Sequence, residues 1–478
     1  MAEFPFLGGS FNGRSPSFDG QRSINCYLEP SESGTSRSAA VLYGTPGLAP
    51  WLSLDGGRVR GCLRFSENVA IVVAGTKVWK VERSKVATEI GTVADVGPVV
   101  SMASNGTTVM MVDGPGGYFI DPAEGTIAAV ASENFFGADR VDFIDGYFIF
   151  NRPDTGQFQI TGLYSTDIEG LDFATAEGGP DNIVSLIADH RELWLFGEDT
   201  TEVWYNVGDV DFPFQRIQGA FLEVGCIATA SVAKADNSIF WLASDDRGFG
   251  TVQRAAGYSP QRVSNHAFEF AVAQYMKAGT VADAVAYTYS QEGHTFYVIS
   301  FPTANATWCL DVSTGLWHER LYRDPVTAQL ERHRSNCQMN FAGLTIVGDY
   351  ETGNLYALDL DTFTDNGVPL PLIRIAPHIT NDTKRVLFHA LELTMQTGVG
   401  LTEGQGADPQ AMLQFSDDGG YAWSNELWTT IGRIGERNSR VRWLRLGQSR
   451  DRVFKVTITD PIRRVITSAS LDTTACAS

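Results

Sequence analysis

Apolar residues recur along the chain in short, nearly continuous runs. Each run is followed by a turn and then by a segment in which apolar and polar residues alternate. Seven such pairs occupy residues 69–81, 108–120, 147–160, 193–205, 239–253, 296–310 and 344–358. Their starts lie about 39 to 57 residues apart, the spacing of four-stranded propeller blades. The pattern predicts an all-β fold with a β-propeller of about six to eight blades over residues 51–369; a pair of β-sandwiches is the alternative.

The turns between these strands repeat as well. Residues 120–125 (IDPAEG) resemble residues 310–315 (LDVSTG). An aspartate that hydrogen-bonds to its own backbone, followed by a glycine that accepts positive φ, suits a tight turn between antiparallel strands. The repeated turn therefore supports the prediction of repeated hairpins.

The stretch 264–277 breaks the strand pattern. Ser264 is a suitable N-cap, and Phe268 and Val272 fall on one side of a short helix. A helix cannot fill a blade position, so we expect this excursion on the outside of the propeller. There, Phe268 and Val272 would form a contact with another subunit or partner.

The two ends of the chain differ from the middle. Residues 1–50 are rich in Gly, Ser and Pro with single phenylalanines, which predicts an extended N-terminal arm that docks onto another surface; a flexible tail is the alternative. Residues 370–478 contain alternating strands, for example 453–459, and predict a C-terminal β-sandwich-like domain.

Composition and charge exclude several classes of protein. The 478 residues are 43% apolar and 19% charged, which excludes a disordered or coiled-coil chain. The net charge of −20 should repel nucleic-acid phosphates. Neither a transmembrane run of 18 apolar residues nor a secretory signal is visible, so we expect no membrane contact. The six cysteines are far apart and are expected to be free thiols, made in a reducing cytosol.

A basic stretch near the C-terminus opposes this overall charge. Residues 433–464 hold ten basic groups, namely Arg433, Arg437, Arg440, Arg442, Arg445, Arg450, Arg452, Lys455, Arg463 and Arg464, against three acids. DNA contact and a solvated strand face are two interpretations. The third is docking on an acidic surface of a neighbouring subunit or of the ring above, for which Arg440, Arg442 and Arg450 are the best candidates because they flank strands.

Signatures of catalysis are missing from the sequence. Neither GxxxxGK[ST] nor GxSxG occurs, and His318-Glu319 begins like HExxH but lacks the second histidine. The acidic loop 359–367 lacks the ligand order of a calcium loop. We therefore expect no catalytic residues, no metal site and no cofactor.

One turn motif is recognisable. Residues 416–423 (SDDGGYAW) fit the Asp-box pattern through Ser416, Asp418, Gly420 and Trp423. The aspartate of such a hairpin caps backbone amides, the glycine makes the turn, and the tryptophan packs beneath. The motif resembles that of sialidase propellers, in which it is structural; here it occurs once, outside the predicted propeller.

Three stretches, near the start, middle and end of the chain, resemble one family. They are residues 21–29 with 42–48, residues 293–303 with 307–320, and the Asp-box with residues 442–454. All are similar to the tail nozzle, or packaged-DNA stabilisation, proteins of short-tailed bacteriophages. The likeness consists of strand and turn patterns and includes no catalytic signature.

The resemblance implies a non-enzymatic virion protein of the tail, made in the cytoplasm of the bacterial host. Family members resemble propeller subunits in a six-fold ring that continues the DNA channel and helps retain the packaged genome. Expected partners are other copies in a homohexamer, the adaptor or head-to-tail connector, and fibre, spike or plug proteins. Double-stranded DNA would pass without sequence-specific binding. The alternative function is a glycan-handling propeller, either a receptor-binding protein or a sialidase-like glycosidase.

Overall fold

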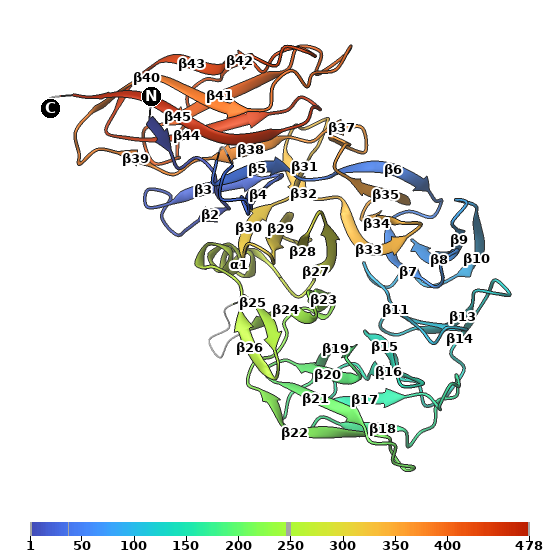
Figure 1. The fold of residues 1–478 in the computed structure, drawn as a ribbon. Coiled ribbons are helices and arrows are strands. Elements are labelled where there is room, and N and C mark those ends of the chain that lie inside the picture. Colours follow the sequence, from blue (N-terminus) through green and yellow to red (C-terminus); the bar gives the residue numbers. More distant parts are fainter. Residues whose placement is uncertain (1, 37, 245–249, 477–478) are drawn as a thin grey trace.

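The structure is a computed structural model that describes residues 2–36, 38–244 and 250–476. Nearly all of its regular elements are strands, which confirms the predicted all-β class. Figure 1 shows a ring of blades viewed along its axis, with a second β unit beside its rim. The propeller with a C-terminal β-sandwich is therefore the observed architecture, and the alternative of two sandwiches is wrong.

Five blades each consist of four consecutive antiparallel strands. Blade 1 contains β7 (Val59–Arg64), β8 (Val69–Ala74), β9 (Lys77–Glu82) and β10 (Ala87–Thr92), and blade 2 contains β11 (Ser101–Ser104), β12 (Val109–Val112), β13 (Gly117–Asp121) and β14 (Thr126–Ala129). Blade 3 contains β15 (Val141–Ile144), β16 (Tyr147–Asn151), β17 (Gln157–Ile160) and β18 (Phe173–Thr175). Blade 4 contains β19 (Ile183–Asp189), β20 (Glu192–Gly197), β21 (Thr201–Asn206) and β22 (Phe214–Leu222). Blade 5 contains β23 (Ala233–Ala235), β24 (Ser238–Ser244), β25 (Gly250–Ala256) and β26 (Ser259–Arg262).

The last two blades are joined to other parts of the chain. Blade 6 contains β27 (Val285–Gln291), β28 (His294–Phe301), β29 (Ala306–Asp311) and β30 (Leu316–Glu319). Blade 7 contains β33 (Ser335–Phe341), β34 (Leu344–Asp349) and β35 (Asn354–Asp359), and its fourth strand is β6 (Gly47–Ser53), which precedes blade 1 in the sequence. In the described part of the chain this makes seven blades, within the predicted six to eight. The ring is thus closed by a strand from its N-terminal side.

The apolar runs in the sequence are the second strands of the blades. In β12, for example, all four residues are buried, because both faces of this strand pack against neighbouring blades. The first strand of each blade lies toward the axis, where β7 contacts both β11 and β33. The core is consequently a series of clusters between blades.

The N-terminal arm joins the propeller to the sandwich. It contains β1 (Ala2–Phe4), β2 (Phe11–Asn12), β3 (Gly20–Ile24), β4 (Cys26–Pro30) and β5 (Ala40–Gly44). Strand β3 pairs in parallel with β30 of blade 6 and antiparallel with β38 (Leu372–Ile375) of the sandwich. One continuous sheet therefore runs from blade 6 through the arm into the sandwich.

The sandwich is built from two sheets. One continues from β38 through β44 (Asp451–Ile458), β41 (Gln410–Ser416) and β42 (Leu427–Thr430), with β39 (Ile379–Thr380) beside β44. The other contains β45 (Val465–Ala475), β40 (Val386–Met395) and β43 (Val441–Ser449), and it is extended by β1, β4 and β5 of the arm. Leu391, Leu413 and Phe454 are buried between the two sheets. The arm thus completes a sheet of the sandwich.

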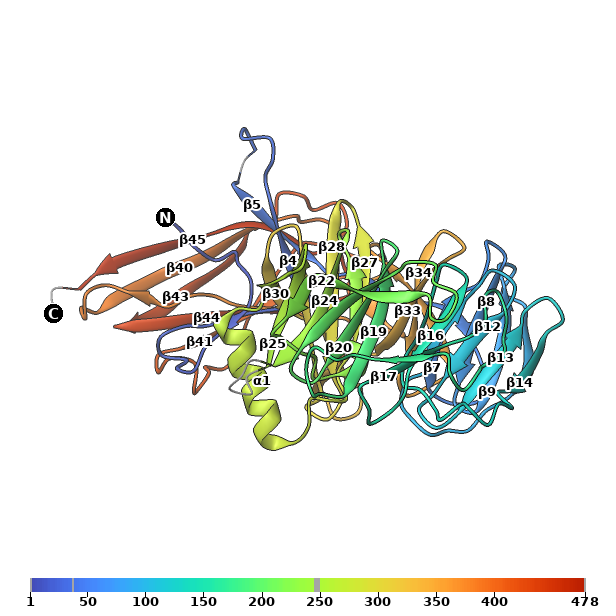
Figure 2. The same ribbon diagram turned by 90° about the horizontal axis from the view of Figure 1, so that it is seen from below.

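Helix α1 (His266–Ala278) lies at the rim, between blades 5 and 6 (Figures 1 and 2). Its N-cap is Asn265, whose side chain accepts a hydrogen bond from Phe268 N at 2.8 Å. The predicted N-cap, Ser264, is wrong, because the Ser264 hydroxyl accepts from Val252 N and donates to Glu269 instead.

The remaining short elements are connections. They are the turn η1 (Thr229–Ser231), the hairpin of β31 (Leu321–Arg323) and β32 (Leu330–Arg332), and the pair β36 (Thr364–Asp365) and β37 (Val368–Pro369). Within the described ranges, the structure has no helix of the length and apolarity that a membrane crossing requires. The domain limits at residues 50 and 369 stay predictions; strand β6 runs across the first of them.

Candidate functional site

The axis of the propeller opens into a pocket of about 170 Å³. Residues from the inner ends of five blades line it, among them Arg60, Ser101, Arg140, Tyr287 and Cys337. The buried guanidinium of Arg60 donates to the carbonyls of Gly97 and Ala94 at 2.8 and 2.7 Å. These hydrogen bonds engage the charged guanidinium of Arg60 inside the fold.

An ion pair accompanies Arg60 in this region. Arg60 Nη2 lies 3.6 Å from Asp113 Oδ2, with both side chains fully buried. Burial lowers the pKa of Arg60 and raises that of Asp113, while their mutual attraction opposes both shifts. In the described residues, no cluster of three metal-ligating side chains occurs here or elsewhere.

A group of hydrogen bonds centred on Arg374 holds the arm between the propeller and the sandwich. Arg374 of β38 is completely buried and donates to Phe6 O at 2.6 Å, Gly9 O at 3.0 Å and Gln21 Oε1 at 2.7 Å. Burial lowers the pKa of Arg374 to about 10, which leaves it protonated at neutral pH. Arg374 consequently fastens a long stretch of the arm to the sandwich.

Two further arm residues contact blade 6 and the hairpin that follows it. Arg22 Nε donates to Glu319 Oε1 at 2.9 Å. The buried Asn25 amide donates to Leu321 O and Pro371 O, and its carbonyl accepts from Leu321 N. Because these contacts span the arm, the propeller and the sandwich, the junction holds all three parts together.

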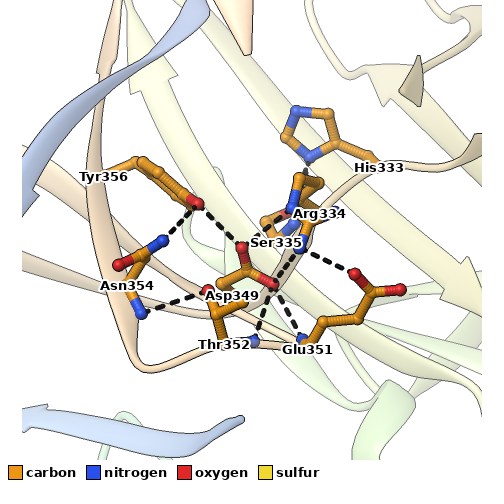
Figure 3. A network of polar contacts seen from close by, with 8 residues as sticks. All are labelled: His333, Arg334, Ser335, Asp349, Glu351, Thr352, Asn354 and Tyr356. Atoms are coloured by element: carbon orange, nitrogen blue, oxygen red, sulfur yellow. Dashed lines mark hydrogen bonds and ion pairs between the residues drawn. The ribbon is translucent and has the colours of Figure 1, made fainter. Parts of the chain in front are cut away.

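A second network fixes blade 7 (Figure 3). Asp349 is buried and accepts from Arg334 Nε at 2.8 Å, from Tyr356 Oη at 2.7 Å and from the amide of Glu351 at 2.8 Å. Burial by itself lowers the pKa of Arg334, but the hydrogen bonds and charge of Asp349 raise it above its ordinary value. The aspartate holds the turn between β34 and β35 against the start of β33.

A buried histidine of blade 6 lies beside the N-terminal arm. His318 of β30 packs near the rings of Tyr27 and Phe296, and its Nε2 has no hydrogen-bond partner in the described residues. Burial, with the nearby charge of Arg320, lowers the pKa of His318 to about 3. The imidazole is therefore neutral in the folded protein at pH 7.

This histidine makes folding sensitive to acid. The folded-state pKa lies below the unfolded value, so stability is fully present above pH 6.5 and is lost as pH falls from 6.5 toward 3. At pH 5, the loss from His318 should be about 2 kcal/mol. Urea unfolding at pH 7.5 and pH 5 should show a smaller pH effect in His318→Asn than in wild type. The exposed His389 provides the control, because His389→Asn should keep the wild-type pH effect.

The Asp-box residues form one turn after β41. Ser416 Oγ donates to Asp418 Oδ1 at 2.7 Å, and Asp418 accepts from the amides of Tyr421 and Ala422. Gly420 has φ of +99°, which the turn requires. The Lys455 ammonium lies 4.5 Å from the ring centroid of the half-buried Trp423. The carboxylate of Asp418 is thus occupied by backbone donors.

The basic stretch is divided between surface and core. Arg452 and Arg464 are fully buried, so their side chains are not part of a solvated face. Arg440 pairs with Glu392, with Nη2 2.5 Å from Oε2, and Arg442 Nε lies 3.7 Å from the same oxygen. Arg450 is exposed. Arg440 and Arg442 are therefore partly neutralised within the chain, whereas Arg450 presents its charge outward.

The structure places Phe268 and Val272 in the core of the chain itself. Both are fully buried, and the Phe268 ring stacks on Trp317 with centroids 4.3 Å apart. These two side chains are covered by blades 5 and 6 within one molecule. Any partner contact of α1 would have to use its exposed side, where Gln274 and Lys277 lie.

The buried arginines of the junction were missed by sequence reasoning. Arg374 stands inside the apolar run 370–376, and an arginine in such a run is a usable signal of a buried, hydrogen-bonded guanidinium. The partners of Arg374 lie more than 340 residues away, however, and no local pattern predicts them.

Two family models match almost the entire chain. A model described as bacteriophage P22 Gp10, beta-propeller, matches residues 2–363, and one described as bacteriophage P22 Gp10, beta-sandwich, matches residues 372–474. A search of the curated proteins finds no match.

Two solved structures are similar in outline. The computationally designed Ika8 protein has a TM-score of 0.42 and 12% identity, over 65% of this chain and 99% of that one. YCF48 bound to D1 peptide has a TM-score of 0.40 and 9% identity, over 66% of this chain and 98% of that one.

Proposed function

Since the chain belongs to the family of the tail protein Gp10 of bacteriophage P22, and is therefore a structural protein of a phage tail, we propose that it forms the ring of the tail nozzle. In this role, six copies surround and continue the DNA channel. The ring helps to retain the packaged genome, contacts the adaptor above, and carries fibre, spike or plug proteins. The protein reaches the virion after synthesis in the host cytoplasm.

The observation that carries this proposal is the joined architecture. Both units are matched by the models of one tail protein, and strand β3 links them in a continuous sheet. The clamp of Arg374 and the pair of Arg22 with Glu319 strengthen this link. A subunit that transmits load along a tail needs such a junction, since two units on a free linker would move independently.

Charge separation supports head-to-tail contact between copies. Residues 1–369 carry a net charge of −22, whereas residues 370–478 are close to neutral, with a formal +2 that includes the buried Arg374, Arg452 and Arg464. Two different, complementary surfaces on one chain generate a closed ring when the rotation between copies closes. The sandwich of one copy, with Arg450 exposed, would dock on the acidic propeller of the next.

The acidity also fits a channel wall. A negatively charged surface repels phosphate, so DNA would slide past without adhering. We propose that double-stranded DNA is a passing partner that is not bound in a sequence-specific manner.

We propose a purely structural role without enzyme activity. The Asp-box carboxylate is engaged by backbone amides, and the buried aspartates described above, Asp113 and Asp349, are paired with arginines. A fluorogenic sialoside should therefore stay intact with the purified protein. Turnover that disappears when a buried carboxylate is replaced would favour the glycan-handling alternative.

The direct test is electron cryo-microscopy of virions. Density for this propeller and sandwich in a six-fold ring below the adaptor is the expected result. Particles in which the chain lies in the capsid, or in a fibre tip, would contradict the proposal.

Reversal of one exposed charge should impair ring assembly. Arg450→Glu should reduce the yield of tailed, infectious particles at least about ten-fold, because a desolvated ion pair at an interface contributes about 1.5 kcal/mol or more in every copy. Arg83→Glu makes the same charge change at an exposed site on blade 1 and serves as the control. Tailed particles are counted by electron microscopy and by plaque assay.

Arg440 and Arg442 need a different design. Arg440→Glu breaks the pair with Glu392, so a defect could arise within the subunit. The double variant Arg440→Glu/Glu392→Arg restores an internal pair and keeps the altered surface at position 440. An assembly defect in both variants supports an interface, whereas rescue by the double variant assigns Arg440 a role within the subunit.

Normal assembly of Arg450→Glu would contradict the docking of the sandwich through this face.

A further inference from the structure

Two cysteines meet across the seam at which the propeller closes. Cys62 Sγ of β7 lies 3.3 Å from Cys337 Sγ of β33, so blade 1 and blade 7 are in contact through this thiol pair. All six cysteines are free thiols. Cys26, Cys226 and Cys309 are buried. The half-buried Cys476 directly follows β45, the last strand of the sandwich.

Both strands that carry the thiols are irregular next to them. The pairing of β7 with β8 shifts register between Val59 and Gly61, and the pairing of β33 with β34 shifts between Ser335 and Cys337. Such β-bulges change the direction of side chains and occur where a strand has to bend. A bulge therefore lies beside each thiol, at matching places in blades 1 and 7.

Space around the thiols is also reserved. A Cβ at Gly348 of β34 would lie 2.4 Å from Val59 Cγ1 and 2.9 Å from Cys337 Sγ, so a larger residue there would press on both side chains. Cys62 and Cys337 are both half-buried, and Cys337 lines the pocket at the axis. A small reagent can therefore reach the pair from the axial opening.

We propose that Cys62 and Cys337 are an oxidation site that forms a disulfide across the closing seam when the protein meets an oxidising medium. A disulfide requires a sulfur–sulfur distance of about 2.05 Å, so each sulfur has to move by only about 0.6 Å. The proposed bond joins blade 7 to blade 1. It closes a covalent loop between two cysteines that lie 275 residues apart in the sequence. It acts in addition to strand β6, which closes blade 7 by strand pairing and by the packing of Trp51 on Phe341.

The oxidant is a low-molecular-weight disulfide. The thiolate of one cysteine attacks a sulfur of the oxidant and expels one small thiolate, which leaves a mixed disulfide. The second cysteine thiolate attacks this mixed disulfide, the protein disulfide forms, and a second small thiolate leaves. The two protons lost by the cysteines go to the two released thiolates, so the oxidant is reduced to two thiols and the protein is oxidised by two electrons.

The reaction should be slow at neutral pH and faster in alkali. The hydrogen bond to Cys337 and burial raise the pKa of Cys62, so little thiolate is present at pH 7. A protein made in a reducing cytosol would therefore remain reduced during assembly and become cross-linked later, outside the cell.

The test uses the full chain treated with oxidised glutathione at pH 8. Thiol titration after denaturation should find about four of the six thiols, and peptide mapping by mass spectrometry should find one linked pair containing Cys62 and Cys337. The midpoint of thermal unfolding should rise by about 5 °C or more and return after dithiothreitol treatment. Cys476→Ser serves as the matched control and should show the same link and the same shift.

Cys62→Ser and Cys337→Ser should each lose the link and the thermal shift. Circular dichroism verifies that they fold; if either does not, the peptide map of the wild-type protein decides by itself. Six remaining thiols after oxidation of the wild-type protein, or a map in which either cysteine is linked to another partner, would overturn the proposal.

Discussion

Replacement of Arg374 by alanine should lower the free energy of unfolding by about 3–5 kcal/mol, since several buried acceptors of charged hydrogen bonds lose their donor together. The guanidinium is completely buried and holds Phe6 O, Gly9 O and Gln21 Oε1. Without it, the arm keeps its strand pairing with β38 but loses these three hydrogen bonds. Urea unfolding followed by tryptophan fluorescence measures the loss, and limited proteolysis should show cleavage within residues 2–24.

Two variants define this prediction more sharply. Arg374→Lys keeps the charge but cannot reach all acceptors, because lysine lacks the planar fork, and it should fall between wild type and alanine. Arg450→Ala, at an exposed position, should stay within about 0.5 kcal/mol of wild type. If Arg374→Ala unfolds within about 1 kcal/mol of wild type, the arm is held by its strands and the clamp is unimportant.

Phe268→Ala should also cost about 3–5 kcal/mol, the usual loss for a fully buried phenylalanine. Its ring stacks on Trp317 and meets Trp308 edge-on at 5.6 Å, so truncation leaves a cavity between α1 and blade 6. Thermal or urea unfolding of the unassembled protein measures the effect. Gln274→Ala, on the exposed side of the same helix, should change stability by less than about 0.5 kcal/mol.

This experiment also separates two roles for the helix. A residue that serves only an interface leaves the unassembled subunit unchanged and impairs assembly. A residue of the internal core destabilises the subunit before assembly begins. An unassembled Phe268→Ala protein as stable as wild type would restore the original expectation of a partner contact.

The repeated hairpins were predictable because their signal is local. In blades 1 and 2, the second strands are buried on both faces, so runs such as 69–74 and 109–112 are almost purely apolar. The first strands gave a weaker signal. Strand β11, with the sequence SMAS, lies toward the axis and alternates between buried and half-buried positions.

Other features could not be predicted because they depend on distant partners. The arm residue Ile24 pairs in parallel with Glu319, and nothing in residues 20–24 indicates that partner. The predicted N-cap of α1 is wrong by one residue, because Ser264 and Asn265 cap equally well in isolation. In the folded protein, the Ser264 hydroxyl is engaged by Val252 N and Glu269, which leaves Asn265 as the cap.

The same limit applies to the candidate interface. Sequence reasoning selected Arg440, Arg442 and Arg450 because they flank strands, and the prediction of an interface there stays untested. The internal partner Glu392 lies 48 residues before Arg440, on the neighbouring strand, and could not be recognised without the sheet register. The structure therefore directs the first experiment to Arg450.

The closing strand β6 has a consequence for biogenesis. It leaves the ribosome about 300 residues before β35, the strand it pairs with, and at about 5–20 residues per second this interval lasts roughly 15 to 60 s. Throughout that time its edge is unpaired, and β1 likewise waits for β45. Completion of the ring is thus a late event governed by contacts of long sequence separation, which makes folding slow and exposes the nascent chain to aggregation. The amount of host chaperone that can shield unpaired strand edges should consequently limit how many folded subunits are available for each burst of progeny.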